Sequence, residues 1–273
     1  DAGLDPTVPA FSTVLACSTS MVAALTAGGL LGGDTDLVLV GGAEVMSNPP
    51  IGLKLEASKR IVKLFRTDPA GALAALQALT PNDLVLPVKG WANRITGRTM
   101  GDHMEETAQN WGIAREAQDD WSFKSHQRAV AGWESGFFDD LVIPLPELAR
   151  DANPRADTSI EKLAALAPAF DKSGKGSLTA GNSSPITDGA AACWVATDRG
   201  LAQLPGGTRH AEFVDFEITA VDHAVDGLLM APSFAIPRLL ARHGLHYADI
   251  ALWEIHEAFA AQVLANVAAL EKP

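Results

Sequence analysis

The sequence predicts an α/β fold that a long helical region interrupts. Short apolar runs at residues 11–16 and 36–40 are typical of buried strands, and the first passes directly into a helix-forming stretch at 18–31. From residue 49 to about residue 137 no strand alternation occurs, and loops alternate with helical patterns. A sheet covered by helices, with a helical insertion, explains these observations.

Length and composition describe a chain able to bury a sizeable core. Its 273 residues are 47% apolar with a mean hydropathy of +0.10, which suits one large domain or two smaller ones. No apolar run approaches the roughly 18 residues of a membrane span. The chain begins at Asp1 without a basic or apolar leader, so we expect a fragment or a processed chain.

Cys17 stands where the first predicted strand meets the first predicted helix. Unpaired N–H groups and the positive end of a helix favour a thiolate there, and the Cys17 N–H is free to hold an oxyanion. Cys17 is therefore a candidate nucleophile. The alternative is a structural role, because a lone cysteine in an apolar run is often simply buried.

The second predicted strand is fully apolar over residues 37–40, which suits a strand buried on both faces. Gly41 and Gly42 follow it and are expected to let the backbone pass close to the Cys17 helix or to a partner subunit. Cys193 lies inside a further apolar strand predicted at 190–197, and we expect it in the core. With only two cysteines, the chain has no disulfide framework, which predicts a reducing compartment.

The insertion contains two predicted helices. One spans 53–66 and is amphipathic with basic residues on its polar face, and the other spans 114–135 and ends at Gly136. His126 of the second helix is expected to be an ordinary packed or surface histidine. Neither C-x-x-C nor H-x-x-x-H spacing occurs, so the sequence predicts no metal site.

Charge is distributed unevenly along the chain. The net charge of −12 argues against nucleic-acid binding, whereas residues 54–98 hold eight basic residues against three acidic ones. This local excess of positive charge suits an anionic ligand, an acidic partner or an anionic membrane surface. A solvated helix face is the simpler alternative. The basic residues are Lys54, Lys59, Arg60, Lys63, Arg66, Lys89, Arg94 and Arg98.

The C-terminal part repeats the arrangement around Cys17. An apolar strand is predicted at 250–255, His256 stands at its end, and a helix follows from 257 to 270. Such a duplication would bring both strand ends to one site, although a histidine at a helix start is the alternative interpretation. Before the strand at 190–197, residues 179–189 form a polar, turn-rich loop whose hydroxyl and amide groups suit amide contacts.

Seven segments in order resemble the thiolases that cleave 3-ketoacyl-CoA, and most of all the β subunits of fatty-acid oxidation trifunctional complexes. They are A-C-S-T-S-M (16–21), D-T-D-L-V-L-V-G-G-A-E-V-M-S (34–47), M-G-D-H-M-E-E-T-A (100–108), R-E-A-Q-D (115–119), K-L-A-A-L-A-P-A-F (162–170), T-A-G-N-S-S-P-I-T-D-G-A-A-A (179–192) and H-E-A-F-A-A-Q (256–262). The resemblance implies duplicated βαβαβ core halves in five αβαβα layers with an inserted, mostly helical loop domain. It places the N-terminal half at 1–48, the loop domain at 49–185, the last strand of that half at 186–205 and the C-terminal half at 206–273.

The same resemblance assigns roles to individual residues. Cys17 would be the acyl-accepting nucleophile, and His256 would polarise the substrate thioester. Together these roles imply an acetyl-CoA C-acyltransferase activity. Ser184, Met104, Ala180 and Phe259 would contact substrate or CoA, while Asn182 would hold its loop together. CoA and acyl-CoA are then substrates, with no covalently bound cofactor and no metal.

Two family segments are absent from these residues: G-H-P, which supplies the general-base histidine, and C-x-G, which supplies a second catalytic cysteine. We therefore expect truncation at both ends. Two alternatives stay open, a biosynthetic acetoacetyl-CoA thiolase or ketosynthase-like enzyme and a non-catalytic acyl-CoA-binding assembly subunit. Expected partners are a second copy in a homodimer or tetramer, a hydratase/dehydrogenase subunit and a membrane surface at 53–66. The expected compartment is a bacterial-type cytoplasm or the mitochondrial matrix.

Overall fold

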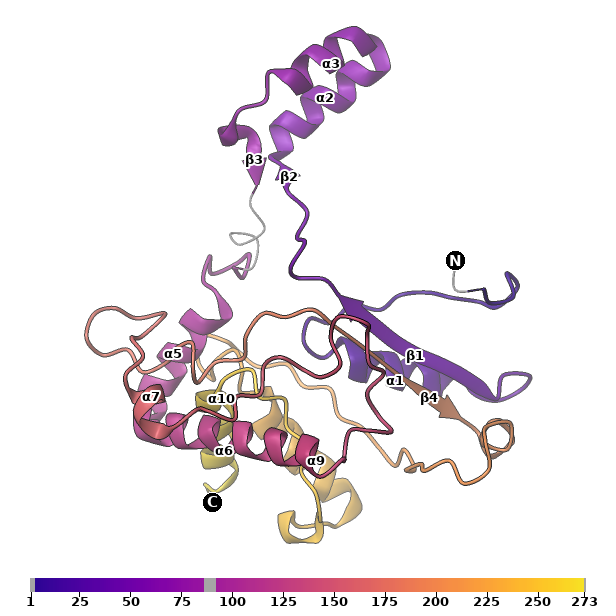
Figure 1. Cartoon of the computed structure of the whole chain (residues 1–273), viewed down its shortest axis with the longest axis vertical. Helices are drawn as coiled ribbons and strands as arrows, with labels where there is room; N and C mark the ends of the chain where they lie inside the picture. Colours follow the sequence, from indigo (N-terminus) through magenta and orange to yellow (C-terminus); the bar gives the residue numbers. More distant parts are fainter. Residues whose placement is uncertain (1–2, 86–91, 273) are drawn as a thin grey trace. The chain divides into compact units, whose positions relative to one another are not determined.

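The computed structural model describes residues 3–85 and 92–272, which form two compact units (Figure 1). The sheet unit consists of Asp1–Pro49 and Ile186–Phe216, and the helical unit of Pro50–Pro185 and Glu217–Pro273. No helix within the described ranges has the length and apolar character needed to cross a membrane. The four predicted domain ranges stay predictions; the helical unit joins residues from the predicted loop domain and C-terminal half.

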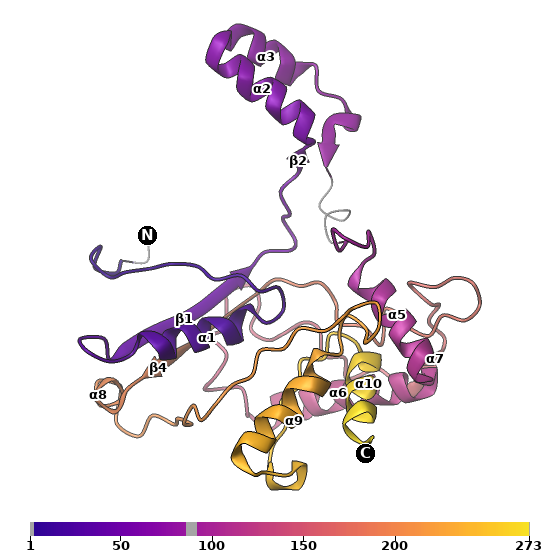
Figure 2. The same ribbon diagram turned by 180° about the vertical axis from the view of Figure 1, so that it is seen from behind.

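The sheet unit is built on two antiparallel strands. β1 (Leu37–Glu44) pairs with β4 (Gly189–Ala196) in a register that runs from Leu37 opposite Ala196 to Glu44 opposite Gly189. Helix α1 (Thr19–Leu30) lies along this sheet in both views, and the short α8 (Asp198–Leu201) follows β4 (Figures 1 and 2). The predicted helix at 18–31 and strand at 190–197 are thus confirmed to within one residue at each end.

Gly41 is needed for the pairing of these strands. A Cβ atom there would lie 3.1 Å from both the Ala191 carbonyl oxygen and the Ala192 Cβ. The close neighbour of Gly41 is therefore β4 rather than the Cys17 helix, and the approach of a partner subunit to the glycine pair stays a prediction. At Gly42 a Cβ would meet nothing within 4 Å.

Three burial predictions in the sheet unit are wrong. The strand expected at 11–16 does not form, and Val14 within it is 87% exposed. β1 is not covered on both faces, since Val40 is its one buried residue, and Cys193 of β4 is exposed rather than in the core. Two strands and one long helix offer too little surface to cover every apolar side chain, and a strand needs a hydrogen-bonding neighbour to form.

The helical unit contains most of the helices. In chain order they are α2 (Leu55–Thr67), α3 (Pro69–Gln77), the 3₁₀ turn η1 (Pro81–Asp83), α5 (Met100–Trp111), α6 (Arg115–Glu134), α7 (Ile160–Ala164), α9 (Ala231–His243), the 3₁₀ turn η2 (Tyr247–Asp249) and α10 (Ala260–Leu270). The predicted helices at 53–66 and 114–135 correspond to α2 and α6, and Gly136 ends the second with a φ of +76°. A small antiparallel pair, β2 (Gly52–Leu53) and β3 (Leu84–Val85), lies where no strand was expected.

Local sequence explains how α5 begins and ends. The Thr99 hydroxyl accepts from the Asp102 N–H at 3.2 Å, and the Asp102 carboxylate accepts from the Thr99 N–H at 2.8 Å, which is a capping box. Gly112 stops the helix with a left-handed φ of +63°. Between these ends, Met104 and Ala108 enter a core cluster completed by Leu178, Met230, Phe259, Ala261 and Ala265.

The C-terminal prediction is partly wrong. Residues 250–255 form no strand, and α10 begins at Ala260, three residues later than the expected helix start. Tertiary contacts explain the later start, because residues within 257–260 form hydrogen bonds to segments distant in the sequence. Those bonds hold the chain extended through Phe259, which has φ −146° and ψ +142°.

Candidate active site

Cys17 lies on a tight turn directly before α1. The Ser18 N–H donates to the Leu15 carbonyl at 2.9 Å. The Thr19 hydroxyl donates to the Ala16 carbonyl at 2.7 Å and accepts from the Leu15 N–H at 2.8 Å. None of these three bonds uses the Cys17 N–H, so the turn is closed around the cysteine by its neighbours.

Ala16 stores strain beside the exposed thiol. Its φ is +44°, a left-handed value that costs a residue with a Cβ about 1–2 kcal/mol. At the start of α1 there is no acidic residue in the first turn, and the Ser18 side chain forms no capping bond. The thiol of Cys17 therefore stands exposed at the positive end of a helix, an arrangement that stabilises negative charge as it develops.

His256 lies in an extended segment of the helical unit and is exposed. The Ser184 N–H donates to the Ala258 carbonyl at 2.9 Å, and the Ala260 N–H donates to the Asn182 carbonyl at 3.0 Å. Between these bonds, Ser183 and Phe259 form an antiparallel bridge. The H-E-A-F segment (256–259) and the turn-rich loop at 179–189, called the N-S-S loop after residues 182–184, are far apart in sequence and thus lie against each other.

Asn182 holds its loop as predicted. Its Oδ1 accepts from the Thr179 N–H at 2.7 Å, and its Nδ2 donates to Asp119 Oδ1 at 3.0 Å and to the Ser177 carbonyl at 3.2 Å. Asp119 is itself bonded by the Arg115 Nε at 2.8 Å. Because Asn182 and Asp119 are both buried, this polar network ties the loop to α6.

Sequence reasoning missed Glu105, which fixes the other end of the same loop. Its carboxylate accepts from the Ser177 N–H at 2.8 Å, the Ser177 hydroxyl at 2.9 Å and the Leu178 N–H at 2.9 Å. Only 3% of Glu105 is exposed. The available signal was its spacing, because Glu105 directly follows Met104 and stands three residues before Ala108 on the buried side of α5.

The predicted binding residues divide into two groups. Ser184 and Ala180 are exposed on the N-S-S loop. Met104, with no exposed surface, and Phe259, 9% exposed, belong to the core cluster, and the Phe259 ring meets Phe170 edge to face at 6.0 Å. Strand-like pairing brings the segments of Ser184 and Phe259 together, with Ser184 bonded to Ala258 and Phe259 bridged to Ser183, while the four ligand-binding roles stay predictions.

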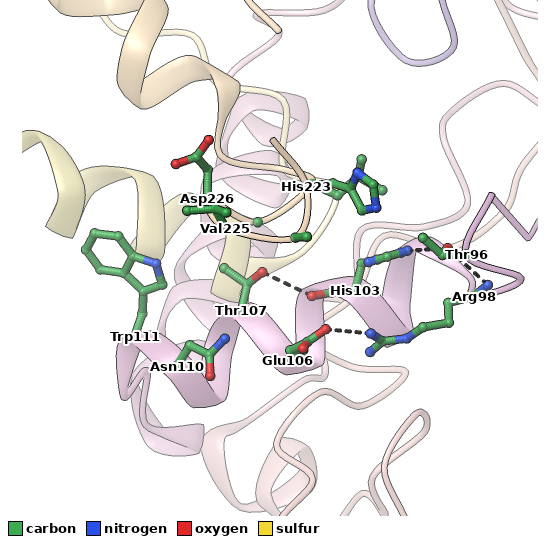
Figure 3. A pocket seen from close by; sticks show the side chains of 13 residues that line it. Thr96, Arg98, His103, Glu106, Thr107, Asn110, Trp111, His223, Val225 and Asp226 are labelled. Carbon is green, nitrogen blue, oxygen red and sulfur yellow. Dashed lines mark hydrogen bonds and ion pairs between the residues drawn. The ribbon is translucent and has the colours of Figure 1, made fainter. Parts of the chain in front are cut away.

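A cavity of about 270 Å³ runs along α5 beside residues 223–228 (Figure 3). His103, rather than its neighbour Met104, lines it, with His103 Nε2 2.8 Å from Thr96 Oγ1 and its ring 6.2 Å from that of His223. Burial, with the nearby Arg98 charge, lowers the pKa of His103. The cavity is lined by Thr96, Arg98, His103, Glu106, Thr107, Asn110, Trp111, His223, Ala224, Val225, Asp226, Gly227 and Leu228.

Within residues 3–85 and 92–272, no group of three or more His, Cys, Asp and Glu side chains is arranged to hold a metal ion.

Known proteins share this sequence and architecture. The N-terminal thiolase domain matches residues 1–199 and the C-terminal thiolase domain matches residues 208–273. The 3-ketoacyl-CoA thiolase of Pectobacterium atrosepticum is 37% identical over 273 residues, and that of Erwinia tasmaniensis is 38% identical over 267. These matches cover 97% and 94% of this chain, and 62% and 60% of the relatives.

Solved structures give the same result. The acetyl-CoA acetyltransferase of Bacillus anthracis matches with a TM-score of 0.75 and 31% identity, covering 94% of this chain and 62% of that one. A thiolase from Ascaris suum in complex with coenzyme A matches with a TM-score of 0.74 and 29% identity, covering 94% and 63%.

Helices, paired strands and an exposed cysteine at a helix start define an α/β protein with the thiolase fold. The chain belongs to the thiolase family. It spans about 62% of the length of the curated relatives that it matches.

Proposed function

We propose that this protein is a 3-ketoacyl-CoA thiolase, an acetyl-CoA C-acyltransferase of fatty-acid β-oxidation. The observation that carries the proposal is the strained turn that exposes Cys17 at the start of α1. The names of the curated relatives support the same activity. CoA and acyl-CoA are its substrates, and no covalently bound cofactor or metal takes part.

The reaction proceeds through a cysteine acyl-enzyme. The Cys17 thiolate attacks the 3-keto carbon, and the bond between C2 and C3 then breaks. Its electron pair leaves with C2 as the acetyl-CoA enolate, which takes up a proton, while the shortened acyl group stays on sulfur as a thioester. The thiol of a second CoA gives up its proton, attacks that thioester and releases the shortened acyl-CoA and free Cys17.

Two groups stabilise the charges that develop. The Cys17 N–H holds the oxyanion formed during acyl transfer, and His256 donates to the thioester oxygen of the departing enolate, directly or through water. Ser184, Ala180, Met104 and Phe259 contact the acyl-CoA or shape its site. Ser184 is supported by its exposed position beside the H-E-A-F segment.

Acyl-enzyme formation tests the proposal directly. A full-length form that includes the general-base segment is incubated with 3-ketoacyl-CoA substrates of several chain lengths, and the acylated residue is mapped by mass spectrometry. We expect the acyl mass on Cys17, its loss in Cys17→Ala and its retention in Cys193→Ala. Acylation that persists in Cys17→Ala would contradict the assignment of the nucleophile.

The 273-residue chain by itself should turn over no 3-ketoacyl-CoA at a useful rate. The histidine that the thiolase resemblance assigns as general base stands in a G-H-P segment, which is not among these residues. Turnover near that of a complete thiolase would mean that the base lies within residues 1–273, with His256 the first residue to test.

A second candidate function is a biosynthetic acetyl-CoA acetyltransferase. Similar structures from Bacillus anthracis and Syntrophomonas wolfei bear that name and favour it. Chain-length preference separates the two functions, because the biosynthetic enzyme should accept acetoacetyl-CoA and discriminate strongly against longer chains.

We propose that the basic surface of α2 contacts an anionic membrane. Lys59, Arg60 and Lys63 are exposed, and so are apolar side chains of the same helix, Val62 at 51% and Phe65 at 54%. Each basic residue near such a surface contributes on the order of 1 kcal/mol. Replacing these three basic residues by glutamate should abolish sedimentation of the protein with anionic vesicles. Unchanged sedimentation would mean that this surface of α2 is only a solvated helix face.

The remaining partners and the compartment are also proposals. We propose a homodimer or tetramer and, within a trifunctional complex, association with a hydratase/dehydrogenase subunit. Bacterial relatives favour the cytoplasm over the mitochondrial matrix. Light scattering of the purified protein and co-purification with the hydratase/dehydrogenase subunit test the two associations.

A further inference from the structure

Glu257 fastens the H-E-A-F segment to α6. Its Oε1 accepts from the Trp121 indole N–H at 2.8 Å, and its Oε2 accepts from the Ser125 hydroxyl at 2.6 Å. Trp121 and Ser125 are four residues apart and therefore share one face of the helix. Both carboxylate oxygens are used, each by a different donor on the same rigid element.

The backbone on the other side of this segment is also fixed. Ala258 and Ala260 bond to the N-S-S loop, and that loop is tied to the same helix through Asn182 and Asp119. α6 thus holds both motifs at once. The first residue outside these bonds is His256.

The His256 ring has no hydrogen-bond partner of its own in the described part of the chain. The backbone that leads into Glu257 therefore sets the place of the His256 Cα atom and the direction in which its side chain leaves the chain. A side chain that must aim a donor at a small target depends on such support, because small displacements weaken a hydrogen bond steeply.

We infer that Glu257 is a positioning residue, whose two bonds to Trp121 and Ser125 fix the backbone that directs His256. The inference rests on the proposed role of His256 at the substrate thioester. A carboxylate suits this position because it accepts from two donors, whereas a glutamine offers one accepting oxygen and turns its NH₂ toward the second donor. The bond lengths of 2.8 and 2.6 Å lie in the range of charge-assisted hydrogen bonds.

The test removes the donors without touching the motif. Trp121→Phe keeps an aromatic ring and loses the N–H, Ser125→Ala loses the hydroxyl, and the double variant loses both. Glu257→Gln and Glu257→Ala form a graded pair on the acceptor side. Lys124→Met is the matched control, because it breaks the 2.7 Å ion pair with Asp120 on the same helix and leaves Glu257 alone.

Two readouts separate positioning from general stability. Amide hydrogen exchange at Ser184 and Ala260 reports the backbone pairing, and the histidine ring carbon signals, assigned with His256→Gln, report the environment of His256. In the Trp121/Ser125 double variant we expect exchange about tenfold faster or more and a displaced or broadened His256 signal. Glu257→Gln should lie between the unaltered protein and Glu257→Ala, and Lys124→Met should change neither readout.

Unmoved His256 signals in both Glu257→Ala and the double variant would overturn the inference, and so would an equal displacement in Lys124→Met. Acetyl-CoA added to the unaltered protein tests the proposed function separately. A His256 signal that acetyl-CoA leaves unchanged, in a protein whose variants do displace it, supports the positioning role and contradicts the role of His256 at the thioester.

Discussion

The segments around Cys17 and His256 are held in opposite ways. Bonds among residues 15–19 close the cysteine turn, so its geometry is local to five consecutive residues. The His256 segment instead depends on bonds from Trp121, Ser125 and Ser184, and the first two bridge separations of 136 and 132 residues. A local site tolerates changes elsewhere, whereas an assembled site depends on every element that contributes to it.

The largest expected effect comes from removing Glu105. Glu105→Ala leaves the buried Leu178 N–H and two part-buried donors of Ser177 without this partner, and an unsatisfied buried donor costs about 1–3 kcal/mol. We expect the helical unit to lose roughly 3–5 kcal/mol in urea unfolding. Its neighbour Glu106 is exposed and pairs with Arg98, so Glu106→Ala is the control and should cost less than about 1 kcal/mol.

The two variants also test the comparison between sites. Glu105→Ala should loosen the N-S-S loop and hence the pairing around His256, while the alkylation rate of Cys17 should stay unchanged. Equal losses of stability for Glu105→Ala and Glu106→Ala would show that the buried carboxylate does not hold the loop.

A smaller effect is expected at Ala16. Because its φ is +44°, Ala16→Gly should relieve strain and stabilise the sheet unit by up to about 1 kcal/mol, and the β-branched Ala16→Val should destabilise it by at least that much. Denaturation followed by the fluorescence of Trp194 in β4 measures both. The reverse order of stability would mean that the cysteine turn is not strained.

The smallest effect concerns pH. Burial lowers the pKa of His103 below its unfolded value of about 6.5, so the unfolded chain binds the proton more readily. Stability is therefore full above about pH 6.5 and falls as the pH drops toward the folded pKa. Unfolding of His103→Gln should depend less on pH between about 7.5 and 5.5 than that of the unaltered protein.

His126 contributes in the same direction, since burial lowers its pKa as well. His103→Gln should therefore reduce the pH dependence without abolishing it. His210 is exposed in the sheet unit, and His210→Gln is the control. A pH dependence that is the same in all three proteins would contradict the assignment to His103.

The two sites also explain which predictions from sequence succeed. The start of α1 is predicted to within one residue, because its turn and first helical residues are consecutive. The start of α10 is wrong by three residues, because bonds from Asn182 and Ser184 hold the chain extended through Phe259. No pattern within residues 250–260 contains that information.

The prediction of side-chain burial from sequence is limited in the same way. An apolar strand around Cys193 predicts a core position, yet burial depends on what covers a strand, and this cysteine is exposed. Similarly, the motif at 100–108 identifies α5 but does not tell which of His103 and Met104 faces a cavity. Glu105 and Glu257 stand inside recognised segments, and only long-range hydrogen bonds reveal what they hold.

The central claim is that the helix start makes Cys17 the reactive thiol, and competition with Cys193 tests it most directly. Both cysteines are exposed, so access alone does not favour either. The folded protein and the protein in urea are treated with limiting iodoacetamide, and mass spectrometry maps the alkylated residue. We expect Cys17 to react faster when folded and the two rates to converge on unfolding; equal rates in the folded protein, or Cys193 first, would contradict the claim.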